Sequence, residues 1–244
     1  MWDNLLYVFG LNIGFVLVVG AGIYLASLFP VFSIPWLIAV AFGIVLLNFY
    51  TGAVSLAARD FSDYKMPALK EFFGYFKETW KRALVISVIT IIQVYIVLFA
   101  FPFYLQRGLL GYAALSVIFW VSVIWMISSQ YYFPIGARLD KNVRKILRKC
   151  FIMFFDNTIF SLVLALGTLL ITAASGFTAF MIPGLTSVLI WHQVGFKLRL
   201  LKYDYLEENP EADRKKIPWD ALLIDDKDRV GHRSLRGMIF PWKE

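Results

Sequence analysis

Charged side chains are excluded from long parts of this chain, and that segregation limits the folds it can adopt. All 24 basic and 17 acidic residues fall outside four stretches, 4–58, 83–106, 108–137 and 157–196. A charge at the centre of a bilayer costs roughly 2.5–3.5 kcal/mol or more, so membrane proteins segregate charge in this way and soluble folds do not. Overall 17% of the residues are charged, against about 25% in soluble domains. The pattern predicts an integral membrane protein and excludes a soluble enzyme, a secreted disulfide scaffold and a nucleic-acid-binding domain.

The lengths of these stretches set the number of crossings. About 20 apolar residues cross a hydrocarbon core of ~30 Å, so the first stretch is long enough for two spans, separated by Pro30 and Pro35. The last stretch would be about 60 Å long as one helix, so it must turn back between Ser175-Gly176 and Pro183-Gly184. The sequence predicts an all-α protein with six transmembrane helices, near 5–29, 36–58, 83–105, 112–137, 157–175 and 179–196.

The positions of Lys and Arg predict the orientation of the helices. Every one of these residues except Arg107 falls in the connections 59–82 and 138–156 or after residue 196. Cytoplasmic connections carry the excess of Lys and Arg in membrane proteins. We therefore expect both termini in the cytoplasm, three very short outer turns, and a location in the bacterial cytoplasmic (inner) membrane.

The two basic connections between spans are amphipathic. At 67–82 and again at 141–155, apolar side chains recur at three- and four-residue spacing with lysines and arginines on other faces. We expect two interfacial helices there, between spans 2 and 3 and between spans 4 and 5. Their expected contacts with anionic phospholipid headgroups or a partner protein are made by Lys70, Lys77, Lys81, Arg82, Arg144, Lys145 and Arg148.

The two amphipathic segments also resemble each other. A shift of 78 residues superposes Leu69 on Leu147 and Phe73 on Phe151, and each segment follows a span that ends in Ala-Arg, at 58–59 and at 137–138. One interpretation is an internal repeat of span, interfacial helix and span. The other is that any basic connection between two spans has this pattern.

The chain divides by composition into a membrane domain, 1–201, and a cytoplasmic tail, 202–244. The tail carries two apolar clusters, 217–224 and 237–243, in a charged background. Because so short a segment makes a poor core by itself, these clusters either dock on the protein's own cytoplasmic face or bind a partner.

Six strongly polar side chains lie within the expected spans, all in the half nearer the cytoplasm. An unsatisfied amide facing lipid is costly, so each should face another helix or a wet cavity. Two interpretations stay open, namely hydrogen bonds between helices and a polar vestibule open to the cytoplasm. The six are Asn12, Asn48, Gln93, Gln130, His192 and Gln193.

Two segments carry a resemblance to a family. The run 72–83, with Phe76-Lys77 and Ala83, resembles the "Phe-Lys-x-Asn-x-x-x-Ala" helix of the YesL-like bacterial membrane proteins, although Thr79 stands where that family has asparagine. Residues 133–139 resemble its "Phe-Pro-x-x-Ala-Arg-Phe" stretch, and Asn157-Thr158 and Asn12 fit as well. The resemblance covers about residues 1–200. It implies a topology and a setting near carbohydrate uptake, and it supplies no catalytic residue.

The sequence therefore favours two functions. The first is a non-enzymatic accessory or scaffold subunit that acts on the cytoplasmic face, with the bilayer, anionic phospholipid, and a membrane-protein partner or a second copy as partners. The alternative is a channel or facilitator for a small neutral solute that uses the polar vestibule. One cysteine, two histidines and spans free of acidic residues predict no catalytic pair, no metal site and no cofactor, and we expect no nucleic acid partner.

Overall fold

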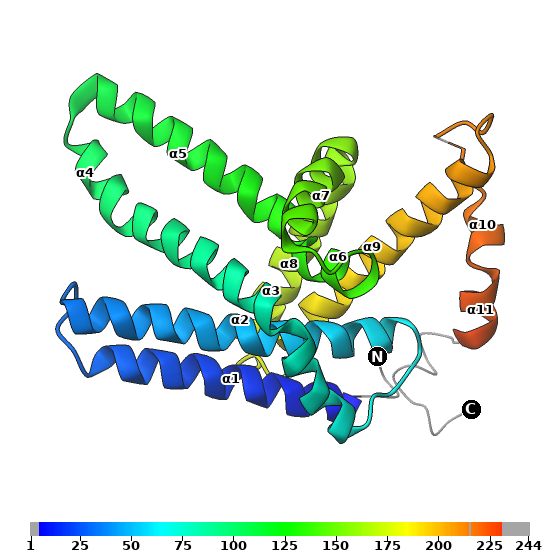
Figure 1. Ribbon diagram of the computed structural model, residues 1–244, viewed down its shortest axis with the longest axis horizontal. Coiled ribbons are helices and arrows are strands. Elements are labelled where there is room, and N and C mark those ends of the chain that lie inside the picture. Colours follow the sequence, from blue (N-terminus) through cyan, green and yellow to red (C-terminus); the bar gives the residue numbers. More distant parts are fainter. Residues whose placement is uncertain (1–4, 215, 231–244) are drawn as a thin grey trace.

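The computed structural model describes residues 5–214 and 216–230, and all regular secondary structure in that part of the chain is helical (Figure 1). In chain order the helices are α1 (Leu5–Ser27), α2 (Ile34–Ser62), α3 (Leu69–Tyr95), the π-helix η2 (Ile96–Ala100), α4 (Phe101–Leu105), α5 (Gly108–Ser129), α6 (Tyr132–Arg138), α7 (Val143–Asp156), α8 (Thr158–Gly176), α9 (Gly184–Glu208), α10 (Trp219–Leu222) and α11 (Ile224–Val230).

Five helical stretches in the described part are long and apolar enough to cross a membrane. They are α1, α2, the stretch Leu69–Leu105 built from α3, η2 and α4, the stretch Gly108–Arg138 built from α5 and α6, and α8. Large apolar side chains such as Leu6, Leu109 and Ile159 are exposed on these helices, as lipid-facing surfaces require. The chain is therefore a multi-spanning helical membrane protein.

The predicted sixth span corresponds to α9, which differs from the prediction at both ends. The helix begins at Gly184 rather than at 179, and it continues without a break through Lys197 to Glu208. The predicted boundary between membrane domain and tail, 201/202, therefore falls inside one helix. The part of α9 that precedes Lys197 is free of charge and measures about 20 Å at 1.5 Å per residue.

The fourth predicted span, 112–137, is divided near its end. α5 stops at Ser129 and α6 begins at Tyr132. Pro134 explains the interruption, because its nitrogen has no hydrogen to donate to the carbonyl of residue 130 and its ring crowds that carbonyl. The break lies in the protein interior, where the hydroxyls of Tyr131 and Ser161 are 2.7 Å apart.

The two basic connections take different forms. The segment 67–82 contributes the first turns of the long α3, whereas α7 is a separate helix that ends at Asn157, where φ is −132° and ψ is 48°. Asn157 aligns with Thr79 in the 78-residue shift. Thr79 donates its hydroxyl to the Tyr75 carbonyl in the same helix at 2.8 Å, while the Asn157 amide oxygen accepts a hydrogen bond from Arg199 of α9 at 3.2 Å. The asparagine therefore bonds across helices, and the chain bends there.

The interior consists of two clusters of buried apolar side chains that meet at α9. One cluster lies among α1, α2, α3 and the first half of α9, and includes Phe15, Val54 and Leu189. The other lies among α3, α5 to α8 and the middle of α9, and includes Ile146 and Phe196. Both α3 and α9 therefore contribute to the two clusters.

The described part of the tail packs against α9. Lys197 pairs with Asp226 of α11 at 2.9 Å, and the Arg199 guanidinium lies 5.9 Å from the centre of the Trp219 ring in α10. Trp219 of the first apolar cluster therefore lies near α9, whereas Ile224 of the same cluster is exposed. The second cluster, 237–243, lies outside the described residues.

Candidate functional site

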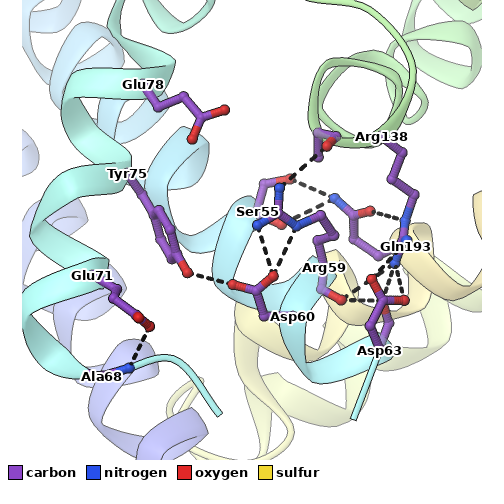
Figure 2. A network of polar contacts seen from close by, with 12 residues as sticks. Ser55, Arg59, Asp60, Asp63, Ala68, Glu71, Tyr75, Glu78, Arg138 and Gln193 are labelled. Carbon is purple, nitrogen blue, oxygen red and sulfur yellow. Dashed lines mark hydrogen bonds and ion pairs between the residues drawn. The ribbon is translucent and has the colours of Figure 1, made fainter. Parts of the chain in front are cut away.

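Polar side chains converge where α2 ends, between α3, α6 and α9 (Figure 2). After α2, Tyr64 takes φ of +59° and reverses the chain, so that the last polar side chains of the helix stay close to α6 and α9. We call this group the α2-end network; it comprises Ser55, Arg59, Asp60, Ser62, Asp63, Tyr75, Arg138, Gln193 and Lys197.

Arg138 of α6 is the most connected side chain of the network. Its two terminal nitrogens donate to the two carboxylate oxygens of Asp63, each at 2.9 Å, which is the bidentate geometry that favours arginine over lysine. One of these nitrogens also donates to Ser62, and Nε donates to the Gln193 side-chain oxygen at 3.2 Å. A single residue therefore ties α6 to both α2 and α9.

Gln193 completes the link between α9 and α2. Its side chain is fully buried, and its amide nitrogen donates to both the carbonyl and the hydroxyl of Ser55, each at 3.1 Å. With its oxygen accepting from Arg138, the amide is satisfied at both ends. Such pairing is what the burial of an amide in an apolar bundle requires.

A second ion pair, within α2, is linked to α3 by a hydrogen bond. Arg59 donates through two nitrogens to one oxygen of Asp60, at 2.8 and 2.9 Å, and the Tyr75 hydroxyl donates to the other oxygen of that carboxylate. Figure 2 shows Tyr75 pointing from α3 toward Asp60. This carboxylate is therefore held from two helices.

The two Ala-Arg pairs contact each other reciprocally. Arg59 donates to the carbonyl of Ala137 at 3.4 Å, and Arg138 donates to the carbonyl of Arg59 at 3.4 Å. Each arginine thus reaches the backbone at the equivalent end of the other half of the chain. The two acceptors are not equivalent, however, because one is the carbonyl of an alanine and the other that of an arginine.

The charges of the network are matched. Arg59 is paired with Asp60 and Arg138 with Asp63, while Lys197 lies 4.0 Å from Asp63 and 2.9 Å from Asp226. Each basic group therefore has a carboxylate within 4.0 Å, although Lys197 depends on Asp226 of α11, which lies outside the network, for its shorter contact. These contacts hold α2, α6 and α9 against one another.

Three of the predicted polar residues lie away from this network and from one another. Asn12 bonds to the turn between α8 and α9. Asn48 donates to the Ile44 carbonyl of its own helix at 3.1 Å, and Gln93 is half-buried in α3. The structure does not bring the six residues into one vestibule.

Gln130 and His192 do share a cavity. It has a volume of about 270 Å³ and lies between α2, α5, α8 and α9, with Thr51 and Thr168 as further polar members of its lining and Met126, Phe133, Leu169 and Leu189 among the apolar ones. His192 Nε2 and the Thr168 hydroxyl are 2.8 Å apart, and Gln130 donates to the Ser161 carbonyl at 3.0 Å. The cavity therefore has neutral hydrogen-bonding groups and apolar walls.

Six of the seven predicted headgroup contacts are exposed. They are Lys70, Lys77, Lys81, Arg144, Lys145 and Arg148. Arg82 differs, because only 5% of it is exposed and its guanidinium donates to the Gly136 carbonyl and to the Glu78 carbonyl. Its place between α3 and α6 makes it a link between helices rather than a headgroup ligand.

The α2-end network was missed from the sequence, although two of its arginines were noticed in the repeated Ala-Arg pairs. The available signal was the acidic pair Asp60 and Asp63 placed directly after Arg59, at the end of a charge-free stretch. Carboxylates at that position need partners, and a second arginine at the equivalent place in the other half, Arg138, is the natural candidate.

Comparisons with known proteins give no match: no family model, no curated protein and no solved structure is similar to this chain. The resemblance to the YesL-like proteins therefore stays a prediction. Among residues 5–214 and 216–230, no group of three or more His, Cys, Asp and Glu side chains is placed to hold a metal ion.

Proposed function

We propose that the protein is a non-enzymatic subunit of a membrane assembly, an accessory or scaffold that acts through its cytoplasmic face. The observation that carries this proposal is the contrast between polar groups inside and outside the bundle. Inside, Asn12 and Gln193 bond to other parts of the protein, whereas six basic side chains of α3 and α7 are exposed and Arg82 is the buried exception. The exposed polar chemistry is therefore at the ends of the helices, where a partner or anionic headgroups would meet it.

The orientation of the chain belongs to the same proposal. The basic connections and the tail should lie in the cytoplasm of a bacterial cell, with the turns 28–33 and 106–107 outside. Because α9 leads into the charged tail, the chain must return through α8 and α9 to the side on which it began. The resemblance to YesL-like proteins makes a sugar uptake system the first partner to examine.

Purification from native membranes in mild detergent tests the subunit role. We expect a partner protein at constant stoichiometry, and we expect the triple variant Arg144→Glu, Lys145→Glu, Arg148→Glu to lose it while its melting curve is unchanged. Arg214→Glu, which alters an exposed arginine outside α7, is the control and should retain the partner. Repeated recovery of the bare protein would reject the role.

The cavity of Gln130 and His192 supports a second candidate, a facilitator for a small neutral solute. Its walls carry hydrogen-bonding groups and no charge, so it would accept an uncharged polar molecule. Glycerol uptake into proteoliposomes is the test. We expect Ala165→Trp, which fills the cavity, to abolish uptake and Ala173→Trp, on an exposed face of the same helix, to retain it. A parent protein no more permeable than empty liposomes would end this idea.

A further inference from the structure

The turn between α8 and α9, residues 177–183, lies against the middle of α1. The Asn12 amide nitrogen donates to the carbonyls of Met181 and Pro183 at 2.8 and 2.9 Å, and its oxygen accepts a hydrogen bond from the backbone of Thr186 at 3.0 Å. In Figure 1 the yellow turn passes behind α1 near the middle of that helix, far from the hairpin that joins α1 to α2.

The position of Asn12 along α1 sets the depth of this turn. α1 ends at Ser27, so about 22 Å of helix remains beyond Asn12 at 1.5 Å per residue. A pocket of about 340 Å³ lies over the turn, lined by Val19 and Ile23 of α1 and by Phe180 of the turn. Beyond this pocket Tyr24 is exposed, and so is Leu28 just after the helix.

The length of α9 also places the turn short of the opposite membrane surface. The segment from Gly184 to Lys197 is about 20 Å long, whereas the hydrocarbon core is ~30 Å thick. With Lys197 at the membrane surface, the turn cannot reach the opposite surface. α8 is long enough to cross, but it ends at the same turn and must therefore lie tilted.

Several backbone groups of the turn are bonded to the protein, as a position in hydrocarbon requires. Ser175 accepts from the Gly184 amide at 2.9 Å through its hydroxyl and from the Phe180 amide at 2.8 Å through its carbonyl, and Asn12 binds the Met181 and Pro183 carbonyls. Non-helical backbone at membrane depth persists only where protein groups satisfy it. By contrast, the hydrogen bonds described for the 28–33 turn are local, such as that from Ser33 to the Pro30 carbonyl at 3.0 Å.

Gly184 shows how closely Asn12 fits. Its φ is +70°, and a β carbon there would collide with the Asn12 amide. Only glycine combines that backbone conformation with so close an approach.

We propose that α8 and α9 form a re-entrant hairpin, which enters and leaves the membrane on the side of the basic connections and turns within the hydrocarbon. Asn12 is the positioning residue that holds the turn. Four crossings and this hairpin replace the six crossings predicted from the sequence, with both termini still on one side. This inference rests on the proposed orientation only for which side of the membrane the hairpin enters. The depth of the turn follows from its contacts with α1.

Depth measurement at Phe177, which is 94% exposed, tests the proposal directly. In a Cys150→Ala background, a membrane-impermeant maleimide should leave Phe177→Cys unlabelled in both sealed and opened membranes, and should label it after denaturation. A spin label at this position should be more accessible to oxygen than to a water-soluble nickel complex. Val31→Cys, in the turn between α1 and α2, should react from outside.

Labelling of Phe177→Cys as fast as Val31→Cys from the outside would overturn the re-entrant hairpin. If Val31→Cys reacts only from the inside, the proposed orientation is wrong, while an unreactive, oxygen-accessible Phe177→Cys still establishes the hairpin.

A second measurement tests the role of Asn12. Asn12→Leu removes three hydrogen bonds to the turn and should lower the melting temperature in detergent by about 5–10 °C. Asn48→Leu is the matched control, since Asn48 bonds only within its own helix among the contacts described, and it should shift the melting temperature little. Equal, small shifts would show that Asn12 does not hold the turn. Labelling at Phe177 needs no change at Asn12, so it stands even if Asn12→Leu does not fold.

Discussion

At the scale of single residues, Arg138 shows how the two halves of the membrane domain are joined. Arg138→Ala removes the bidentate pair with Asp63 and the bond to Gln193, and should lower the free energy of unfolding by about 2–3 kcal/mol. Reversible unfolding in mixed detergent micelles measures this change. Lys145→Ala, at an exposed position on α7, is the control and should stay within about 0.5 kcal/mol of the parent.

A double-mutant cycle shows whether the cost comes from the ion pair. In the Asp63→Ala background, Arg138→Ala should cost less than in the parent, because the partner is already gone. Equal costs in the two backgrounds would mean that Arg138 acts through other contacts.

Cys150 illustrates how burial controls reactivity. The side chain is fully buried in α7, and burial raises the pKa of its thiol to about 12. Because the thiolate is the reactive form, only about one thiol in 10⁴ is reactive at pH 8. We expect almost no maleimide labelling of the native protein and complete labelling after denaturation. An added cysteine on the exposed face of the same helix, Lys145→Cys, should react fast, and equal rates at the two positions would contradict the buried placement.

At the scale of elements, the docking of α11 on α9 depends on one ion pair. Asp226→Ala removes the partner of Lys197 and should loosen the connection 209–218 and speed its cleavage, which limited proteolysis followed by mass spectrometry would detect. Asp225→Ala changes the net charge equally at a neighbouring exposed position and should leave the digestion pattern unchanged. Equal digestion of both variants and the parent would show that this pair does not hold the tail.

The charge-free stretches were enough to predict the membrane class and most helix positions, because the cost of a buried charge acts locally along the chain. The sequence predicted a break after both amphipathic segments, near 82 and near 156, but only the second forms, and that difference depends on a tertiary contact. Asn157 bonds to Arg199, which lies in a helix far along the chain. The start of α9 also depends on a residue far away in the sequence, because Asn12 of α1 accepts a hydrogen bond from the Thr186 amide.

The candidate site was beyond sequence analysis for a related reason. The polar residues were judged by their depth in each span, but Gln193 and Asn12 are satisfied by partners in other helices, so depth alone could not separate structural amides from a cavity lining. Gln130 and His192 share a cavity only because α5 and α9 pack on either side of it.

At the scale of the whole molecule, the proposed arrangement separates charge between the two sides of a membrane. In the proposed orientation, the two basic connections and the tail lie on one side, and the α2-end network lies where these segments meet. The other side has short turns, and Arg107 is the one basic residue of the sequence that falls in them. The returning hairpin of α8 and α9 is what keeps the tail with the other basic segments.

Reporter fusions test this arrangement most directly. Fluorescent protein, which folds in the cytoplasm, and alkaline phosphatase, which is active only outside it, would each be fused after residue 31, after residue 107 and at the carboxyl terminus of the full chain. We predict active phosphatase at the two turns and fluorescence at the carboxyl terminus. Phosphatase activity at the carboxyl terminus, together with activity after residue 31, would place the tail across the membrane from the basic connections and contradict the account.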